Sequence, residues 1–133
     1  MLSDAGRELS KQVGLYVKQA NIPHDLPIVS PMCRAKETAE LAYGGGSVDT
    51  GLIYSGSMTS VEKTPVLART KELLSLPVPK GTNRLLVAHA PNLMDIMGYF
   101  PKEATLVIFK PEEDHFTYLG SIPPTHWKTL LEK

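Results

Sequence analysis

The sequence predicts an α/β fold of three layers, α/β/α, in which helices cover both faces of a mainly parallel sheet. Short apolar runs that suit buried strands alternate along the chain with longer segments whose apolar residues recur at helical spacing. Two further strand-like runs near the C-terminus are neighbours in sequence, which predicts an antiparallel edge. A chain of 133 residues has the length of one domain, so we expect a single domain over 1–133.

Five segments are predicted to be helical from their apolar spacing and end signals. Ser3 is a favourable N-cap for the first helix, and Ser30 with Pro31 suits the N-cap and first turn of the second. Thr64 and Pro65 open the third in the same way. The predicted ranges are 3–19, 30–43, 64–76, 91–98 and a terminal segment that includes 127–131.

The predicted strands are apolar or alternating runs bounded by proline and turn residues. They cover 26–29, 85–88, 105–109 and 115–119, and the last two are expected to pair as a hairpin. The segment 47–60 is rich in Gly, Ser and Thr, so we expect a loop there, with one short strand around 52–53. The order is unusual for a three-layer domain because it begins with a helix.

Composition excludes several classes of function. The 14 basic and 14 acidic residues balance, so the chain lacks the basic surface of a nucleic-acid-binding protein. No apolar run is long enough to span a membrane, and the first residues lack the features of a signal peptide. Cys33 is the only cysteine, which excludes an intramolecular disulfide and a multi-cysteine metal site. We expect no metal, no cofactor, no nucleic acid and no membrane as partners.

Two strand-to-helix junctions carry the residues of chemical interest. One places Arg34 in the first turn of the second helix, and the other places His89 where a buried strand ends. If the two strands are neighbours in a parallel sheet, Arg34 and His89 converge at its carboxyl edge, where α/β sheets bind ligands. Helix N-termini and an arginine fork both bind phosphate oxygens. The sequence therefore predicts a phosphate-binding pocket formed by Arg34 and His89.

Each of these residues also has a structural interpretation. Considered alone, His89 is more typical of a core or capping histidine, bonded to a backbone carbonyl, than of a ligand-binding one. Cys33 suits a buried thiol beside the pocket, and Arg7 an ion pair on the first helix. The remaining histidines, for which we expect no role in the site, are His24, His115 and His126.

Three motifs together resemble the histidine phosphatase superfamily, also called phosphoglycerate-mutase-like. They are LSDAGR at 2–7, SPMCRAKETA at 30–39 and VAHAPNL at 87–93, in the order and spacing of that superfamily. The segment IPPTHW at 122–127 is similar to a bacterial branch of small members. The resemblance extends over essentially the whole chain.

The resemblance implies phosphoryl transfer through a covalent phosphohistidine. In that superfamily the nucleophilic histidine belongs to an Arg-His-Gly or Arg-His-Ala motif at the end of the first strand, and this strand lies in the middle of the sheet. By motif, Arg34 matches the second arginine of the phosphate pocket and His89 the second histidine, so His89 is not the nucleophile. The family often also has an acidic residue that protonates the leaving oxygen; no position here clearly matches it, although Glu62 lies in the loop-to-helix region where one is expected. The Arg-His pair belongs upstream of residue 2. The resemblance therefore implies an N-terminally incomplete domain that lacks the usual first central strand.

Three hypotheses follow for function. The first is that the chain is a truncated phosphomonoesterase domain, inactive or impaired in this form. The second is that it is a pseudoenzyme that keeps an anion pocket and serves as a binding or assembly module. The third is that it is a phosphatase with another nucleophile. The expected ligand is phosphate or a phosphorylated small molecule. Since loss of a central strand leaves two sheet edges unpaired, we also expect a homodimer or strand-exchanged oligomer.

Overall fold

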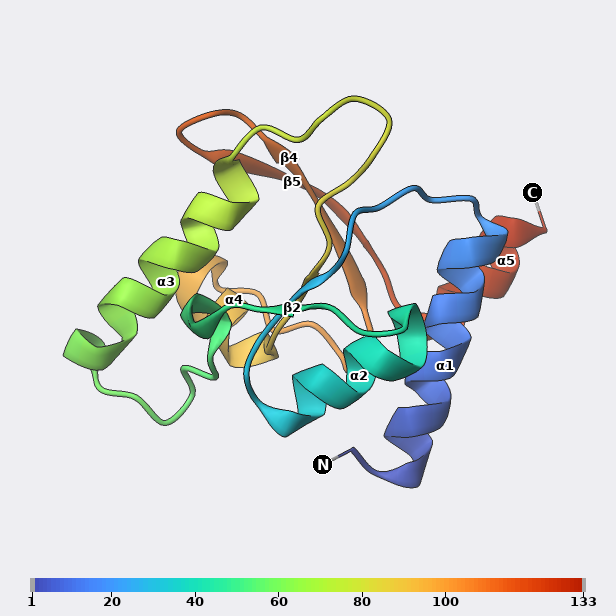
Figure 1. Ribbon diagram of the computed structural model, residues 1–133, viewed down its shortest axis with the longest axis horizontal. Helices are drawn as coiled ribbons and strands as arrows, with labels where there is room; N and C mark the ends of the chain where they lie inside the picture. Colours follow the sequence, from blue (N-terminus) through green and yellow to red (C-terminus); the bar gives the residue numbers. More distant parts are fainter. Residues whose placement is uncertain (1, 133) are drawn as a thin grey trace.

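The computed structural model describes residues 2–132, in which helices surround two small sheets (Figure 1). Helices α1 and α2 pack against each other, and α3 contacts α4. The helices are α1 (Asp4–Gln19), α2 (Cys33–Tyr43), α3 (Ser60–Ser75), α4 (Ala90–Met97) and α5 (Trp127–Leu131), with short 3-10 helices at Thr50–Leu52 and Pro124–His126. The strands are β1 (Ile28–Val29), β2 (Ser47–Val48), β3 (Leu86–Val87), β4 (Leu106–Pro111) and β5 (Phe116–Ile122).

The parallel sheet has three short strands in the order β2-β1-β3. Strand β1 is central, with Ile28 opposite Leu86 and Val29 opposite Val87. The predicted combination of helices with a parallel sheet is confirmed. Within residues 2–132, no helix combines the length and apolar character that a membrane span requires.

Strands β4 and β5 form the predicted antiparallel hairpin, but it is a second sheet and not an edge of the first. The hairpin packs instead on a separate apolar cluster, in which Leu106 and Ile122 contact the buried residues Val13, Val17 and Trp127 of α1 and α5. The hairpin thus buries its apolar face against helices without a hydrogen bond to the parallel sheet.

A second apolar cluster lies between α2 and the parallel sheet. It contains Val29 and Val87 from the strands and Ala35 and Ala39 from α2, and all four are buried. Tyr43, at the end of α2, packs against both clusters. Burial raises the pKa of its phenol above the ordinary value, so the hydroxyl stays protonated. Tyr43 is the residue through which the two halves of the core meet.

Helix starts differ from the predictions at two places. Helix α1 begins as expected after Ser3, whose side chain accepts a hydrogen bond from the backbone of Gly6. Helix α2 begins at Cys33 and not at the Ser30-Pro31 pair; its N-cap is Met32, whose backbone N–H donates to the Ser30 hydroxyl. Helix α3 begins four residues before Thr64, because Thr59 and Glu62 form a reciprocal capping box.

Two predicted strands are also misplaced or too long. The strand expected near 52–53 is at Ser47–Val48, and Leu52 instead ends a 3-10 helix with its side chain fully buried. The strand expected over 26–29 is only Ile28–Val29, because Leu26 is 67% exposed. Strand β3, which covers Leu86–Val87, is likewise shorter than its predicted run of 85–88.

Helices α1 and α2 approach closely at Gly14. A Cβ built on Gly14 would lie 2.1 Å from the carbonyl oxygen of Ala42, which is backbone and cannot rotate away. We expect Gly14→Ala to lower the free energy of unfolding by about 1–3 kcal/mol in urea denaturation, because the clash outweighs the better helix propensity of alanine.

Gly120 offers the matched control for this variant. A Cβ there meets nothing within 4 Å, and its φ is outside the left-handed region. Gly120→Ala is expected to change stability by less than about 0.5 kcal/mol. Equal destabilisation by the two variants would contradict the clash between a side chain at Gly14 and the backbone of α2.

Candidate functional site

The pairing of β1 with β3 brings the two predicted site residues to one edge of the sheet. Both strands are parallel and in register, so Ser30 and His89 follow their carboxyl ends. Arg34 lies in the first turn of α2 and is exposed, whereas His89 is the half-buried N-cap of α4. Arg34 and His89 thus belong to two strand-to-helix junctions at the same edge of the sheet. That they form one phosphate-binding pocket stays a prediction.

The imidazole ring of His89 is held from two sides. Its Nε2 lies 2.7 Å from the hydroxyl oxygen of Ser30, which is fully buried. The ring of Tyr54 meets it edge to face, with 5.4 Å between centroids and 81° between planes. Neither Ser30 nor Tyr54 was predicted as a site residue. A polar residue directly after the buried strand was a readable signal for Ser30, whereas no local signal identified Tyr54.

His89 is neutral in this environment. Burial lowers its pKa below the ordinary value of 6.5, and the charge of Arg34 lowers it further. At neutral pH the ring therefore carries one N–H and no charge, and Arg34 supplies the positive charge of the pair. The arrangement offers an anion one charged fork and one neutral donor.

Asn92 fixes the segment that carries Tyr54. Its side-chain oxygen accepts hydrogen bonds from the backbone N–H of Ser55 at 2.9 Å and from the Ser55 hydroxyl at 3.0 Å. Its side-chain amide donates to the carbonyl of Ile53 at 2.8 Å. Asn92 is 2% exposed, so these bonds are shielded from water. The side chain therefore ties the backbone on both sides of Tyr54 to α4.

The other histidines lie away from Arg34 and His89. His24 precedes β1, at the opposite end of the sheet, and its ring stacks edge to face on Tyr43. His115 lies in the β4–β5 turn, where the Asp114 carboxylate raises its pKa. His126 ends a 3-10 helix. Among residues 2–132 no group of three potential ligands could hold a metal ion.

Three further residues have structural positions. Glu62 accepts a hydrogen bond from the backbone N–H of Thr59, so it caps α3. Arg7 pairs with Asp4 and with Glu37, as its structural interpretation predicts. Cys33 is exposed, so the expectation of a buried thiol was wrong: it is the first residue of α2, and the face of that helix toward the sheet is made by alanines.

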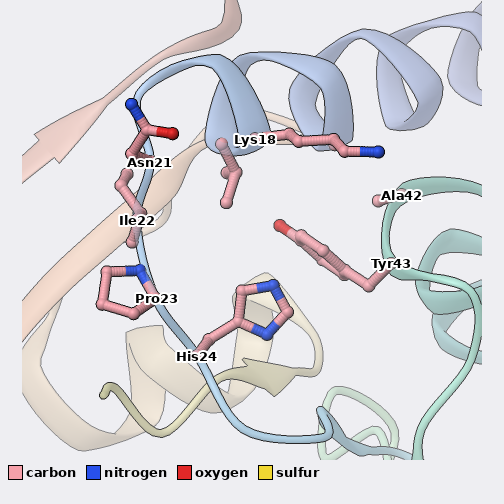
Figure 2. A pocket seen from close by; sticks show the side chains of 9 residues that line it. Lys18, Asn21, Ile22, Pro23, His24, Ala42 and Tyr43 are labelled. Atoms are coloured by element: carbon pink, nitrogen blue, oxygen red, sulfur yellow. The ribbon is translucent and has the colours of Figure 1, made fainter. Parts of the chain in front are cut away.

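A hollow of about 530 Å³ lies away from this site, between the C-terminal ends of α1 and α2 (Figure 2). Its polar lining includes His24, Lys18 and the hydroxyl of Tyr43, and in Figure 2 the Tyr43 hydroxyl points into the hollow. His24 precedes β1 whereas Ser30 follows it. The hollow is thus at the amino end of the parallel sheet and not at the edge occupied by Arg34 and His89.

Replacing Asn92 tests the clamp on the Tyr54 segment. Asn92→Ala leaves the N–H of Ser55 and the carbonyl of Ile53 without their partner, so we expect a loss of about 2–4 kcal/mol in the free energy of unfolding. The exposed Asn83 also donates one hydrogen bond to a backbone carbonyl, that of Pro23. Asn83→Ala is the control and should cost under about 1 kcal/mol; equal losses would contradict the clamp.

A scan of protein-family models finds no match to the sequence, and a search of curated proteins finds none either. Among solved structures, the chain is similar to one described as the protein histidine phosphatase SixA complexed with tungstate. The TM-score is 0.66 at 18% sequence identity, and the alignment covers 94% of this chain and 85% of that one. At this identity the similarity establishes the fold: the chain has the α/β fold of a protein histidine phosphatase.

Proposed function

We propose that the site formed by Arg34 and His89 binds the phosphoryl group of a phosphate monoester. The observation that carries the proposal is their convergence at the carboxyl edge of the parallel sheet, in the fold of a phosphatase. The SixA structure holds tungstate, an oxyanion of phosphate-like shape, which supports an anion as the ligand. The proposal treats 1–133 as one histidine-phosphatase-like domain.

The residues would divide the binding as follows. Arg34 is exposed in the first turn of α2 and offers a planar fork to two phosphoryl oxygens. His89 adds a neutral donor at the start of α4, and the N-terminal N–H groups of both helices favour negative charge. Tyr54 forms an aromatic wall beside His89. One charged group and several neutral donors suit a phosphate that enters from solvent.

We propose that these 133 residues, on their own, bind the phosphoryl group without hydrolysing its ester. The resemblance implies a nucleophilic histidine in an Arg-His motif, and no Arg-His pair occurs in the sequence. His89 matches the second histidine of the pocket. Ser30 bonds His89 but is 0% exposed, so its hydroxyl cannot reach a phosphorus atom. A positioned anion without a nucleophile gives binding but no covalent step.

Phosphate binding is tested by thermal unfolding in increasing orthophosphate or orthovanadate. We expect the midpoint to rise with anion concentration, because an anion that binds only the folded chain stabilises it. Arg34→Met should weaken this binding at least tenfold, which is about 1.4 kcal/mol. Lys36→Met, an exposed cation of the same helix, is the control and should leave the protection unchanged.

Hydrolysis of 4-nitrophenyl phosphate tests the catalytic part of the proposal. We expect the parent chain to hydrolyse this ester no faster than the His89→Ala variant does. Turnover by the parent chain that disappears in His89→Ala would contradict the proposed inactivity and favour a phosphatase with another nucleophile. Absence of anion protection in the parent chain would instead contradict the binding site itself.

We also propose that the chain assembles into a homodimer or strand-exchanged oligomer. The two sheets share no hydrogen bonds, so β3 and β4 each have an unpaired edge within residues 2–132. Thr105 Oγ1 and Trp127 Nε1, beside the hairpin, are buried with no hydrogen-bond partner in that same range. Unpaired edges and unsatisfied buried groups both favour pairing with another chain.

Size-exclusion chromatography with light scattering tests this assembly. We expect the parent chain to elute as a dimer or larger species, because strand pairing between copies satisfies the open edges. Ala88→Lys places a charge directly after β3 and should shift the species toward monomer. Val48→Lys, on the exposed edge strand β2 of the same sheet, is the control. A well-folded parent monomer at every concentration would contradict the proposal.

A further inference from the structure

The hydroxyl proton of Ser30 has one acceptor. Ser30 is fully buried, so this proton needs a partner inside the protein. The Oγ lies 2.7 Å from Nε2 of His89 and accepts a hydrogen bond from the backbone N–H of Met32 at 3.3 Å. Within residues 2–132, no other hydrogen bond involves this hydroxyl. Its donor capacity can therefore be used only toward Nε2.

This restriction distinguishes the two neutral tautomers of His89. With the proton on Nε2, ring and hydroxyl would both be donors across the 2.7 Å contact, and the buried hydroxyl proton of Ser30 would have no acceptor. With the proton on Nδ1, Nε2 accepts from Ser30 while Ser30 accepts from Met32. Only the second arrangement satisfies every group, and an unsatisfied buried donor is costly.

We infer that Ser30 is a positioning residue that holds His89 in the tautomer with its proton on Nδ1. Two further observations support a fixed, uncharged ring. Tyr54 packs edge-on against it and limits its rotation. Burial and Arg34 lower the pKa of His89, and protonation would also place a proton on Nε2 and take away the acceptor of Ser30.

The tautomer determines what His89 offers to a ligand. Nδ1 has no hydrogen-bond partner within residues 2–132, so its N–H is available as a donor while the ring stays neutral. If the proposed function holds, this N–H donates to a phosphoryl oxygen, and the anion gains a second donor beside Arg34 without a second charge. This last step rests on the proposed function, whereas the tautomer itself does not.

The tautomer is measured directly from the ring nitrogens. In long-range ¹H–¹⁵N spectra a protonated ring nitrogen and a bare one resonate in well-separated regions, and His89→Gln identifies the signals of His89. At neutral pH we expect Nδ1 protonated and Nε2 bare in the parent chain. Ser30→Ala should release the ring, so that both nitrogens move toward averaged shifts. Ser10→Ala, a buried serine on α1 bonded to Gly6, should leave the His89 signals unchanged.

Each outcome decides one part of the inference. Nε2 protonated in the parent chain, or Ser30→Ala with unaltered ring shifts in a folded protein, overturns the role of Ser30. The parent spectrum alone decides the tautomer if Ser30→Ala does not fold. Adding orthophosphate then separates the two proposals: a correct tautomer whose Nδ1 signal ignores phosphate contradicts the phosphate site, and leaves the positioning role intact.

Discussion

The parallel pairing of β1 with β3 is the constraint on which the site depends. It opposes Val29 to Val87 and lets the Ser30 backbone N–H donate to the carbonyl of Val87 at 2.9 Å. From there the Ser30 side chain reaches His89, although the two are 59 residues apart. Because side chains alternate across a strand, a slip of one residue would turn Ser30 to the other face of the sheet. A few backbone hydrogen bonds thus align the histidine, the serine and the start of α2.

Most of the helices, and the position of the Arg34 and His89 junctions at one edge of the parallel sheet, could be predicted from the sequence. Apolar spacing and caps are local signals, and two matched strand-to-helix junctions indicate one sheet edge when their strands are neighbours. Ser30 shows where local reasoning fails. Ser-Pro before a helical run is typical of an N-cap, but α2 starts at Cys33, and the Ser30 hydroxyl contacts both the backbone N–H of Met32 and the distant ring of His89. The contact with His89 depends on the fold and has no local sequence signal.

Other parts of the structure had no sufficient local signal. Strand β2 pairs through only two residues, Ser47 and Val48. Both are exposed, so the sequence has no apolar run there that would predict a strand. The hairpin was predictable from alternation, but its separation from the parallel sheet depends on pairing between distant segments. The position of Tyr54 depends on Asn92, a contact between a loop and a helix. The start of α3 is different, since Thr59 with Glu62 was a readable capping signal.

The hydrogen bonds of Asn92 to the main chain have a consequence for how this site can diversify. They hold the Ile53 carbonyl and the Ser55 N–H, and none of them involves the side chain of Tyr54. The residue at 54 can therefore be exchanged while the backbone path around it is kept. Position 56 can gain a side chain only when residue 54 becomes smaller, because a Cβ on Gly56 would lie 2.5 Å from the ring of Tyr54. Positions 54 and 56 form a coupled pair at which the shape of the wall beside His89 can evolve without loss of the fold.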